Sequence, residues 1–105
     1  MRVIVLFNLK PGKIAADYEA WARTRDIPGV RSLPSVDDFT VLRTTGLLGS
    51  DAKAPFAYVE IIEIADMEGF WTDIATEASQ ALAAEFRDWA DAEPVFMTTE
   101  ELGLG

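Results

Sequence analysis

The first apolar segment of the chain has the composition of a buried β-strand. Residues 2–9 are almost wholly apolar and rich in β-branched and aromatic side chains. Such a run is typical of a strand with both faces covered. A Lys-Pro-Gly sequence at 10–12 ends this strand. Apolar positions then recur at helical spacing, which predicts an amphipathic helix over residues 14–25.

The middle of the chain combines turn signals with strand patterns. Pro28 and Gly29 prevent a simple continuation of the first helix, so residues 26–35 are expected to form a connector. Side chains then alternate between two faces, which predicts strands over 36–45 and 56–64 joined by a loop.

The second half of the chain carries a long helical pattern. Asp66 is placed to cap a helix, and apolar residues recur at spacings of three and four as far as Trp89. Gly69 and Thr76 are expected to break this pattern into two helical pieces. A short last strand is predicted over residues 95–97.

The predicted order of elements, β-α-β-β-α-β, is that of the ferredoxin-like split-βαβ motif. We therefore expect one α+β domain over residues 1–105, with a four-stranded antiparallel sheet and helices on one face. The opposite face is also apolar, for example at Ile4 and Leu6, which predicts a homodimeric α/β barrel in which a second copy covers it. The alternative is a monomer whose loops cover the sheet. Residues 98–105 are expected either to be loose or to cross to the partner.

Charge and composition narrow the range of partners and chemistry. The net charge of −9 opposes binding to phosphate backbones and anionic lipids, so we expect neither nucleic acid nor membrane as a partner. Without cysteine or histidine there is no thiolate or imidazole chemistry, and we expect no metal and no cofactor. The opening apolar run is too short for a membrane span and no signal cleavage site follows it, which favours a cytoplasmic protein.

A candidate small-molecule site is expected where one face of the sheet meets the helices. The hairpin of the two middle strands brings Arg43 opposite Tyr58 or Glu60. Residues 21–36 would carry the chain over one mouth of the sheet as a lid stiffened by two prolines. The other side chains expected to line this pocket are Asn8, Tyr18, Trp21, Arg25 and Trp71, with Phe70 beside the last. Aromatic walls with a few polar contacts are the usual composition of a ligand site.

The polar candidates also predict a type of chemistry. Glu60 or Asp26 would accept a proton, with its pKa raised by burial. Arg43 or Arg25 would bind an enolate or carboxylate oxygen, and one of the two tyrosines would donate a hydrogen bond. This set suits proton transfer, cyclisation or condensation on an aromatic or polyketide-like substrate. It equally suits cofactor-free oxygenation.

Each candidate also has a purely structural interpretation. Arg43 and Glu60 would then be an ion pair, and Arg25 and Asp26 would brace the end of the first helix. Trp89 in particular is expected to lie in the core. The residue types alone leave these alternatives open.

Three long segments resemble a known family. MRVIVLFNLKPG, YEAWARTRDIPGVRSLPSVDDFTVLRTTGLL and YVEIIEIADMEGFW are closely similar to the REDY-like HapK family, and the similarity runs over nearly the whole chain. The resemblance implies a dimeric α/β barrel of ferredoxin-like protomers. It also implies a place in bacterial secondary metabolism, on the branch of prodigiosin-type pigment biosynthesis that makes the methoxy-bipyrrole carbaldehyde. The family has no catalytic motif that carries over residue by residue.

The expected fold also resembles the cofactor-free antibiotic-biosynthesis monooxygenases. They line a protomer pocket with Asn, Trp, Tyr and Arg side chains, and Asn8, Trp21, Tyr58 and Arg43 are candidates of the same kind. Our first expectation is a homodimer that binds a pyrrole-type small molecule. The alternatives are a non-catalytic accessory protein for partner enzymes of the pathway and a cofactor-free monooxygenase or cyclase.

Overall fold

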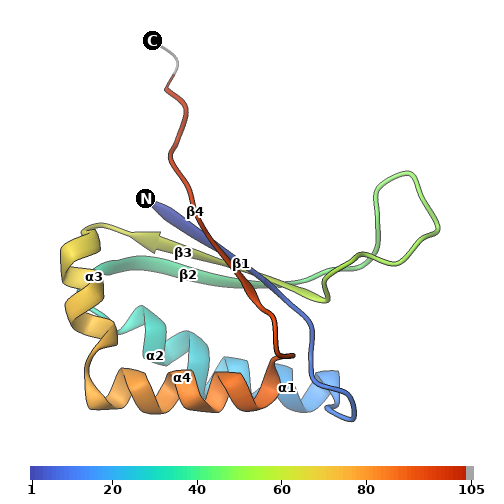
Figure 1. Cartoon of the computed structure of the whole chain (residues 1–105), viewed down its shortest axis with the longest axis horizontal. Coiled ribbons are helices and arrows are strands. Elements are labelled where there is room, and N and C mark those ends of the chain that lie inside the picture. The colour runs from blue at the N-terminus through green and yellow to red at the C-terminus, as the bar shows by residue number, and fades with distance from the viewer. Residues whose placement is uncertain (104–105) are drawn as a thin grey trace.

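The computed structural model describes residues 1–103 and has the predicted order of strands and helices. The four strands form one antiparallel sheet in the order β2-β3-β1-β4, and the helices lie together on one of its faces (Figure 1). The elements are β1 (Arg2–Phe7), α1 (Ala15–Trp21), a π-helical turn η1 (Ala22–Asp26), α2 (Ile27–Arg31), β2 (Val36–Arg43), β3 (Tyr58–Ile64), α3 (Met67–Ile74), α4 (Glu77–Trp89) and β4 (Val95–Thr98). The ferredoxin-like α+β fold is therefore confirmed.

The prediction of a non-helical connector over residues 26–35 is wrong for the first half of that segment. The helix continues through η1 into α2, and a loop begins only after Arg31. In η1 the N–H of Ile27 donates to the carbonyl of Ala22, five residues back. Pro28 lies in the first turn of α2, where its missing N–H is not needed. The wide turn thus accommodates the proline, and Asp26 is buried.

The other boundaries differ from the expected ones by a few residues. Thr76 caps α4 by accepting a hydrogen bond from the N–H of Ser79 (3.2 Å), so the expected division at this point is confirmed. Asp66 caps α3 through the N–H of Gly69 (3.1 Å). The expected two pieces are α3 and α4, and the break does not fall at Gly69, which lies inside α3 in the first turn that Asp66 caps.

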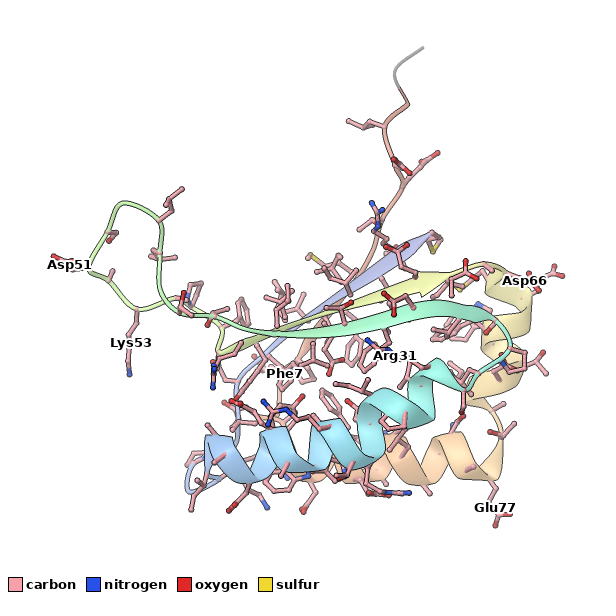
Figure 2. All side chains as sticks on the ribbon, turned by 180° about the vertical axis from the view of Figure 1, so that it is seen from behind. Phe7, Arg31, Asp51, Lys53, Asp66 and Glu77 are labelled. Atoms are coloured by element: carbon pink, nitrogen blue, oxygen red, sulfur yellow. The ribbon has the colours of Figure 1, made fainter. Side chains whose placement is uncertain are left out.

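The core lies between the sheet and the helices and is rich in aromatic rings. Figure 2 shows Phe7 of β1 between these two layers. Its ring stacks on Tyr58 at a centroid distance of 5.5 Å and meets the edges of Tyr18 and Phe86 at 5.6 and 4.9 Å. Offset-stacked and edge-to-face pairs of this kind stabilise a core beyond the area they bury. They hold α1 and α4 against the sheet.

The face of the sheet opposite the helices is open in the single chain. Its side chains, which are partly or largely exposed, include Ile4, Leu6, Leu42, Val59, Ile61, Val95 and Met97. The β2–β3 loop and the segment after β4 extend away from the body of the molecule (Figure 1). Residues 98–105 were expected to be loose or to cross to a partner, and the last two of them, 104–105, lie outside the described residues. In the described chain no helix has the length and apolarity to cross a bilayer.

Candidate functional site

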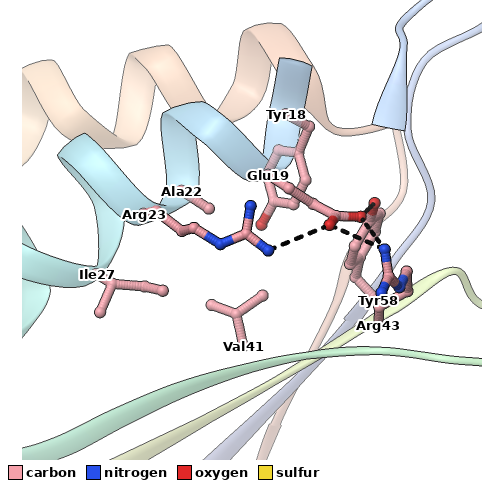
Figure 3. A pocket seen from close by; sticks show the side chains of 8 residues that line it. All are labelled: Tyr18, Glu19, Ala22, Arg23, Ile27, Val41, Arg43 and Tyr58. Carbon is pink, nitrogen blue, oxygen red and sulfur yellow. Dashed lines mark hydrogen bonds and ion pairs between the residues drawn. The ribbon is translucent and has the colours of Figure 1, made fainter. Parts of the chain in front are cut away.

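A hollow of about 210 Å³ opens between the first helical segment and the sheet. Figure 3 shows the side chains that line it, with walls from α1, η1 and the start of α2 on one side and from β2 and β3 on the other. The lining residues are Tyr18, Glu19, Ala22, Arg23, Ile27, Val41, Arg43 and Tyr58. Apolar and aromatic walls with a charged mouth are typical of small-molecule sites.

Two buried carboxyl groups lie in the layer between the sheet and the helices, next in sequence or in register to residues that line this hollow, but neither lines it. Glu60 is in register with Val5 and Val41 on the helix-facing side of the sheet, while η1 carries Asp26. Each residue is only 5% exposed. Among residues 1–103, Asp26 Oδ2 and Glu60 Oε2 are buried without a hydrogen-bond partner. Such groups are costly in a fold unless they carry a proton or meet a polar ligand atom.

Burial changes the protonation of both carboxyl groups. It raises the pKa of Asp26 to about 7, with a smaller contribution from the charge of Glu85. Burial also raises the pKa of Glu60 well above its ordinary value, and the charge of Asp26 adds to this. A charge on Asp26 therefore favours the protonated form of Glu60. A carboxyl group whose pKa lies near 7 is suited to proton transfer.

Tyr18 adds a third buried polar group. Its side chain is fully buried, and its hydroxyl lacks a hydrogen-bond partner within the described chain. Burial raises the pKa of this phenol, and the charges of Glu60 and Asp26 raise it further. The hydroxyl therefore stays protonated and is available as a hydrogen-bond donor to a ligand.

Glu19 organises the mouth of the hollow. Its Oε1 accepts a hydrogen bond from Arg43 Nη1 (3.0 Å) and lies 3.6 Å from Arg23 Nη2. Its Oε2 accepts from the hydroxyl of Tyr58 (2.8 Å) and from Arg43 Nη1 (3.2 Å). Burial and the bond to Glu19 raise the pKa of Tyr58 to about 12, so this phenol also stays protonated. One carboxylate thus joins α1 to strands β2 and β3.

Several of the expected neighbours do come together. Arg43 lies directly opposite Tyr58 in the β2–β3 ladder, which confirms the expected pairing, and Val41 rather than Arg43 lies opposite Glu60. The ion pair between Arg43 and Glu60, considered as a structural alternative, is wrong because Arg43 pairs with Glu19 instead.

Trp21 and Arg25 face α4 rather than the hollow. Trp21 Nε1 donates to Glu85 Oε1 (2.8 Å), and Arg25 donates to both oxygens of the same carboxylate. These bonds lower the pKa of Glu85 to about 2. The start of the expected lid is therefore a brace between helices. Trp89 packs against the core, as expected.

Asn8 and Trp71 also lie away from the hollow. The amide of Asn8 donates to the carbonyl of Pro55 (3.1 Å) and accepts from the N–H of Ala57 (2.8 Å), which fastens the end of β1 to the β2–β3 loop. Asn8 also borders a second hollow of about 390 Å³ near residues 91–95. Trp71 is 64% exposed on α3, whereas its neighbour Phe70 packs against the core.

Glu19 is the site residue that the sequence reasoning missed. Its spacing of four residues from Arg23 is a signal for an ion pair along a helix. Its bonds to Arg43 and Tyr58 depend on how α1 packs on the sheet, which the local pattern does not show. Within residues 1–103, no group of three acidic, His or Cys side chains is arranged to hold a metal ion.

The fold and sequence have clear relatives. The sequence model of the REDY-like protein HapK matches residues 1–102. The chain belongs to the REDY-like HapK family. Membership in the HapK family indicates a protein of secondary metabolism. Comparison with the sequences of curated proteins finds no match.

Solved structures agree with this family assignment. The crystal structure of HapK from Hahella chejuensis is 32% identical and has a TM-score of 0.74, with 100% of this chain and 96% of that chain covered. An EthD-family protein from Bacillus halodurans is 20% identical (TM-score 0.74; 96% and 97% covered). SnoaB, a cofactor-independent oxygenase from Streptomyces nogalater, is 18% identical (TM-score 0.70; 99% and 96% covered). The last two share the fold with this HapK-family chain.

Proposed function

We propose that this HapK-family protein binds a pyrrole-containing intermediate of prodigiosin-type pigment biosynthesis, on the branch that makes the methoxy-bipyrrole carbaldehyde, in the cytoplasm. The observation that carries the proposal is the hollow with apolar and aromatic walls and with arginines at its mouth. Two buried carboxyl groups lie behind it, one next to Ile27 in the sequence and one in register with Val41. Family membership supports the pathway.

The chemistry of a pyrrole ligand matches this arrangement. A pyrrole ring is flat and apolar on its faces, which suits walls formed by Val41, Ile27 and the tyrosine rings. Its N–H is a hydrogen-bond donor, and the carboxylate of Asp26 would be a strong acceptor if the ligand reached behind Ile27. A carbonyl oxygen at the other end of the ligand would accept from Arg43.

A second candidate function is cofactor-free catalysis by a monooxygenase or cyclase. It is favoured by the carboxyl group of Asp26, whose pKa of about 7 suits a general base. The carboxylate would accept a proton from the substrate, and the electron pair left on the substrate would be stabilised by an arginine at the oxygen. That electron pair would then react with dioxygen or with an electrophilic carbon of the same molecule. The third candidate is an accessory protein that delivers intermediates to partner enzymes.

The test is incubation of the purified protein with candidate bipyrrole intermediates, with and without oxygen, followed by mass spectrometry. Turnover that is lost in Asp26→Asn or Glu60→Gln and in Arg43→Ala, with the fold intact by circular dichroism, would establish an enzyme. Saturable binding without turnover would establish a carrier or accessory protein. Absence of both binding and turnover with every bipyrrole would contradict the proposal.

The functional unit in this proposal is a homodimer. The open face of the sheet carries apolar side chains from all four strands, and Leu42, Val95 and Met97 are among its most exposed members. A contiguous apolar face of this kind is rare on a monomer and usually marks an interface. A second copy related by two-fold symmetry would cover it with the same face of its own sheet.

A further inference from the structure

The hollow is small for the ligand proposed above. Its volume of about 210 Å³ lies below the roughly 300 Å³ at which typical ligand pockets begin. Something at the hollow must therefore move when a ligand of two rings enters. The rings of Tyr18 and Tyr58 are buried in the core, so the groups free to move lie at the mouth.

The mouth is a set of hydrogen-bond donors that already surrounds a carboxylate. Arg43, Tyr58 and Arg23 all direct donors toward the two oxygens of Glu19 (Figure 3). Arg43 Nη1 contacts both oxygens of this carboxylate, and arginine is the side chain that proteins most often use to bind carboxylate ligands. Here the carboxylate comes from the protein itself.

The mobility of these four side chains differs. Tyr58 is buried and fixed in the sheet, whereas the side chains of Arg43 and Arg23 are 65% and 69% exposed and can reorient in water. Glu19 is only 14% exposed but belongs to a helix surface, from which its long side chain can swing outward. Its bonds to exposed arginines are screened by solvent and are each weak.

We propose that Arg43, Tyr58 and Arg23 form a subsite for a carboxylate or enolate oxygen of the ligand, and that Glu19 occupies this subsite in the free protein. The inference rests on the proposed ligand site. When the ligand binds, its oxygen replaces those of Glu19, and the departure of the Glu19 side chain enlarges the hollow. Glu19 thus tunes specificity, because an anionic ligand oxygen competes with its carboxylate for the arginines more effectively than a neutral carbonyl oxygen does.

The test compares two simple probes that differ in charge. Pyrrole-2-carboxylate carries the anionic oxygen and pyrrole-2-carboxaldehyde is its neutral counterpart, and binding is measured by calorimetry and by the NMR shifts of Val41 and Ile27. Glu19→Gln removes the competing charge but retains an oxygen for the Tyr58 hydroxyl. We expect this variant to bind the carboxylate about tenfold more tightly, because the ligand no longer has to displace a charge-assisted hydrogen bond of Glu19. Binding of the aldehyde should change less than twofold.

The matched control is Asp17→Asn, which removes one negative charge from the exposed side of the same helix. It should leave the affinity for both probes unchanged at moderate ionic strength. If Glu19→Gln changes both probes alike, or weakens the carboxylate, Glu19 is only a structural brace and the inference is overturned.

Failure of the inference and failure of the proposed function give different results. If the aldehyde binds in the hollow of the unchanged protein but Glu19→Gln brings no selective gain, the ligand site stands and the competing carboxylate is refuted. If the carboxylate binds Glu19→Gln without moving the signals of Val41 and Ile27, the subsite stands and the pyrrole pocket is refuted. If neither probe binds any variant, both are refuted.

Discussion

Asp26 and Glu60 carry carboxyl groups that are buried between the sheet and the helices, where an ionised group loses its hydration free energy. Each is buried, and neither has a basic side chain as an ion-pair partner within the described chain. A fold keeps such groups against their free-energy cost when they serve a ligand or a reaction. At the residue scale, this cost is the clearest sign of function in the molecule, and it makes stability depend on pH.

Asp26→Asn should stabilise the protein, and more so at high pH. The pKa of Asp26 is raised from 3.8 to about 7 in the folded state, so between these values the folded state holds a proton that the unfolded state has lost. Stability therefore falls as pH rises through this window and levels off above it. We expect the gain in unfolding free energy from Asp26→Asn to be about 2 kcal/mol larger at pH 8 than at pH 5.

Urea unfolding at the two pH values measures this difference. Asp37→Asn, at an exposed position of β2, removes the same charge without relieving burial and should give no such pH-dependent gain. A gain that is equal at both pH values for Asp26→Asn would show that this carboxyl group is ionised in the folded protein throughout the range.

The positions of the candidate site's side chains could be predicted from the sequence where those side chains belong to strands. Arg43, Tyr58 and Glu60 share a face because strand side chains alternate, and the hairpin puts the first two opposite each other. Trp21 and Arg25 were misplaced because their common partner Glu85 lies on α4. The contact between two helices far apart in the sequence has no local signal.

At the scale of elements, the π-helical turn η1 is the feature that sequence patterns did not predict. Proline and glycine usually end a helix, so the sequence predicted that the first helix would end before Pro28. Here one widened turn places Pro28 at the start of α2, and the helical direction is kept. Single π-helical turns inside α-helices are often found at functional sites, and this one carries Asp26.

Helix α4 begins at a side-chain cap whose removal should be measurable. Thr76 accepts a hydrogen bond from Ser79 N–H and donates one to the carbonyl of Asp73 (2.9 Å). Thr76→Ala should lower the unfolding free energy by about 1 kcal/mol, the usual cost of a lost N-cap. Chemical denaturation measures it. Thr76→Ser keeps the hydroxyl and should cost much less, whereas equal losses in both variants would assign the effect to the methyl group.

At the scale of the whole molecule, the order of elements and the apolar pattern were enough to predict the fold. A ferredoxin-like order leaves one sheet face without helices, and the structure has that face open (Figure 1). The apolar pattern of the strands also predicts that a second copy of the chain covers this open face, but the structure of a single chain does not test that prediction. The proposed homodimer therefore depends on an experiment in solution.

Ile61→Glu should convert the proposed dimer to a monomer. Ile61 lies on the central strand β3, in register with Ile4 and Thr40, so the new carboxylate would be buried without a partner at the centre of the interface. Sedimentation velocity at micromolar concentration should give twice the mass of one chain for the unchanged protein and the mass of one chain for the variant. Ala81→Glu, at an exposed position of α4, should remain dimeric. A monomeric unchanged protein would refute the dimer.

The central claim is that the hollow between η1 and the sheet is the ligand site. It is tested most directly by an NMR titration of the methyl-labelled protein with the methoxy-bipyrrole carbaldehyde. We predict saturable shifts at Ile27 and Val41, which line the hollow, and none at Ile4 and Ile61 on the open face of the sheet. Shifts confined to the open face, or no saturable shift at all, would contradict the account.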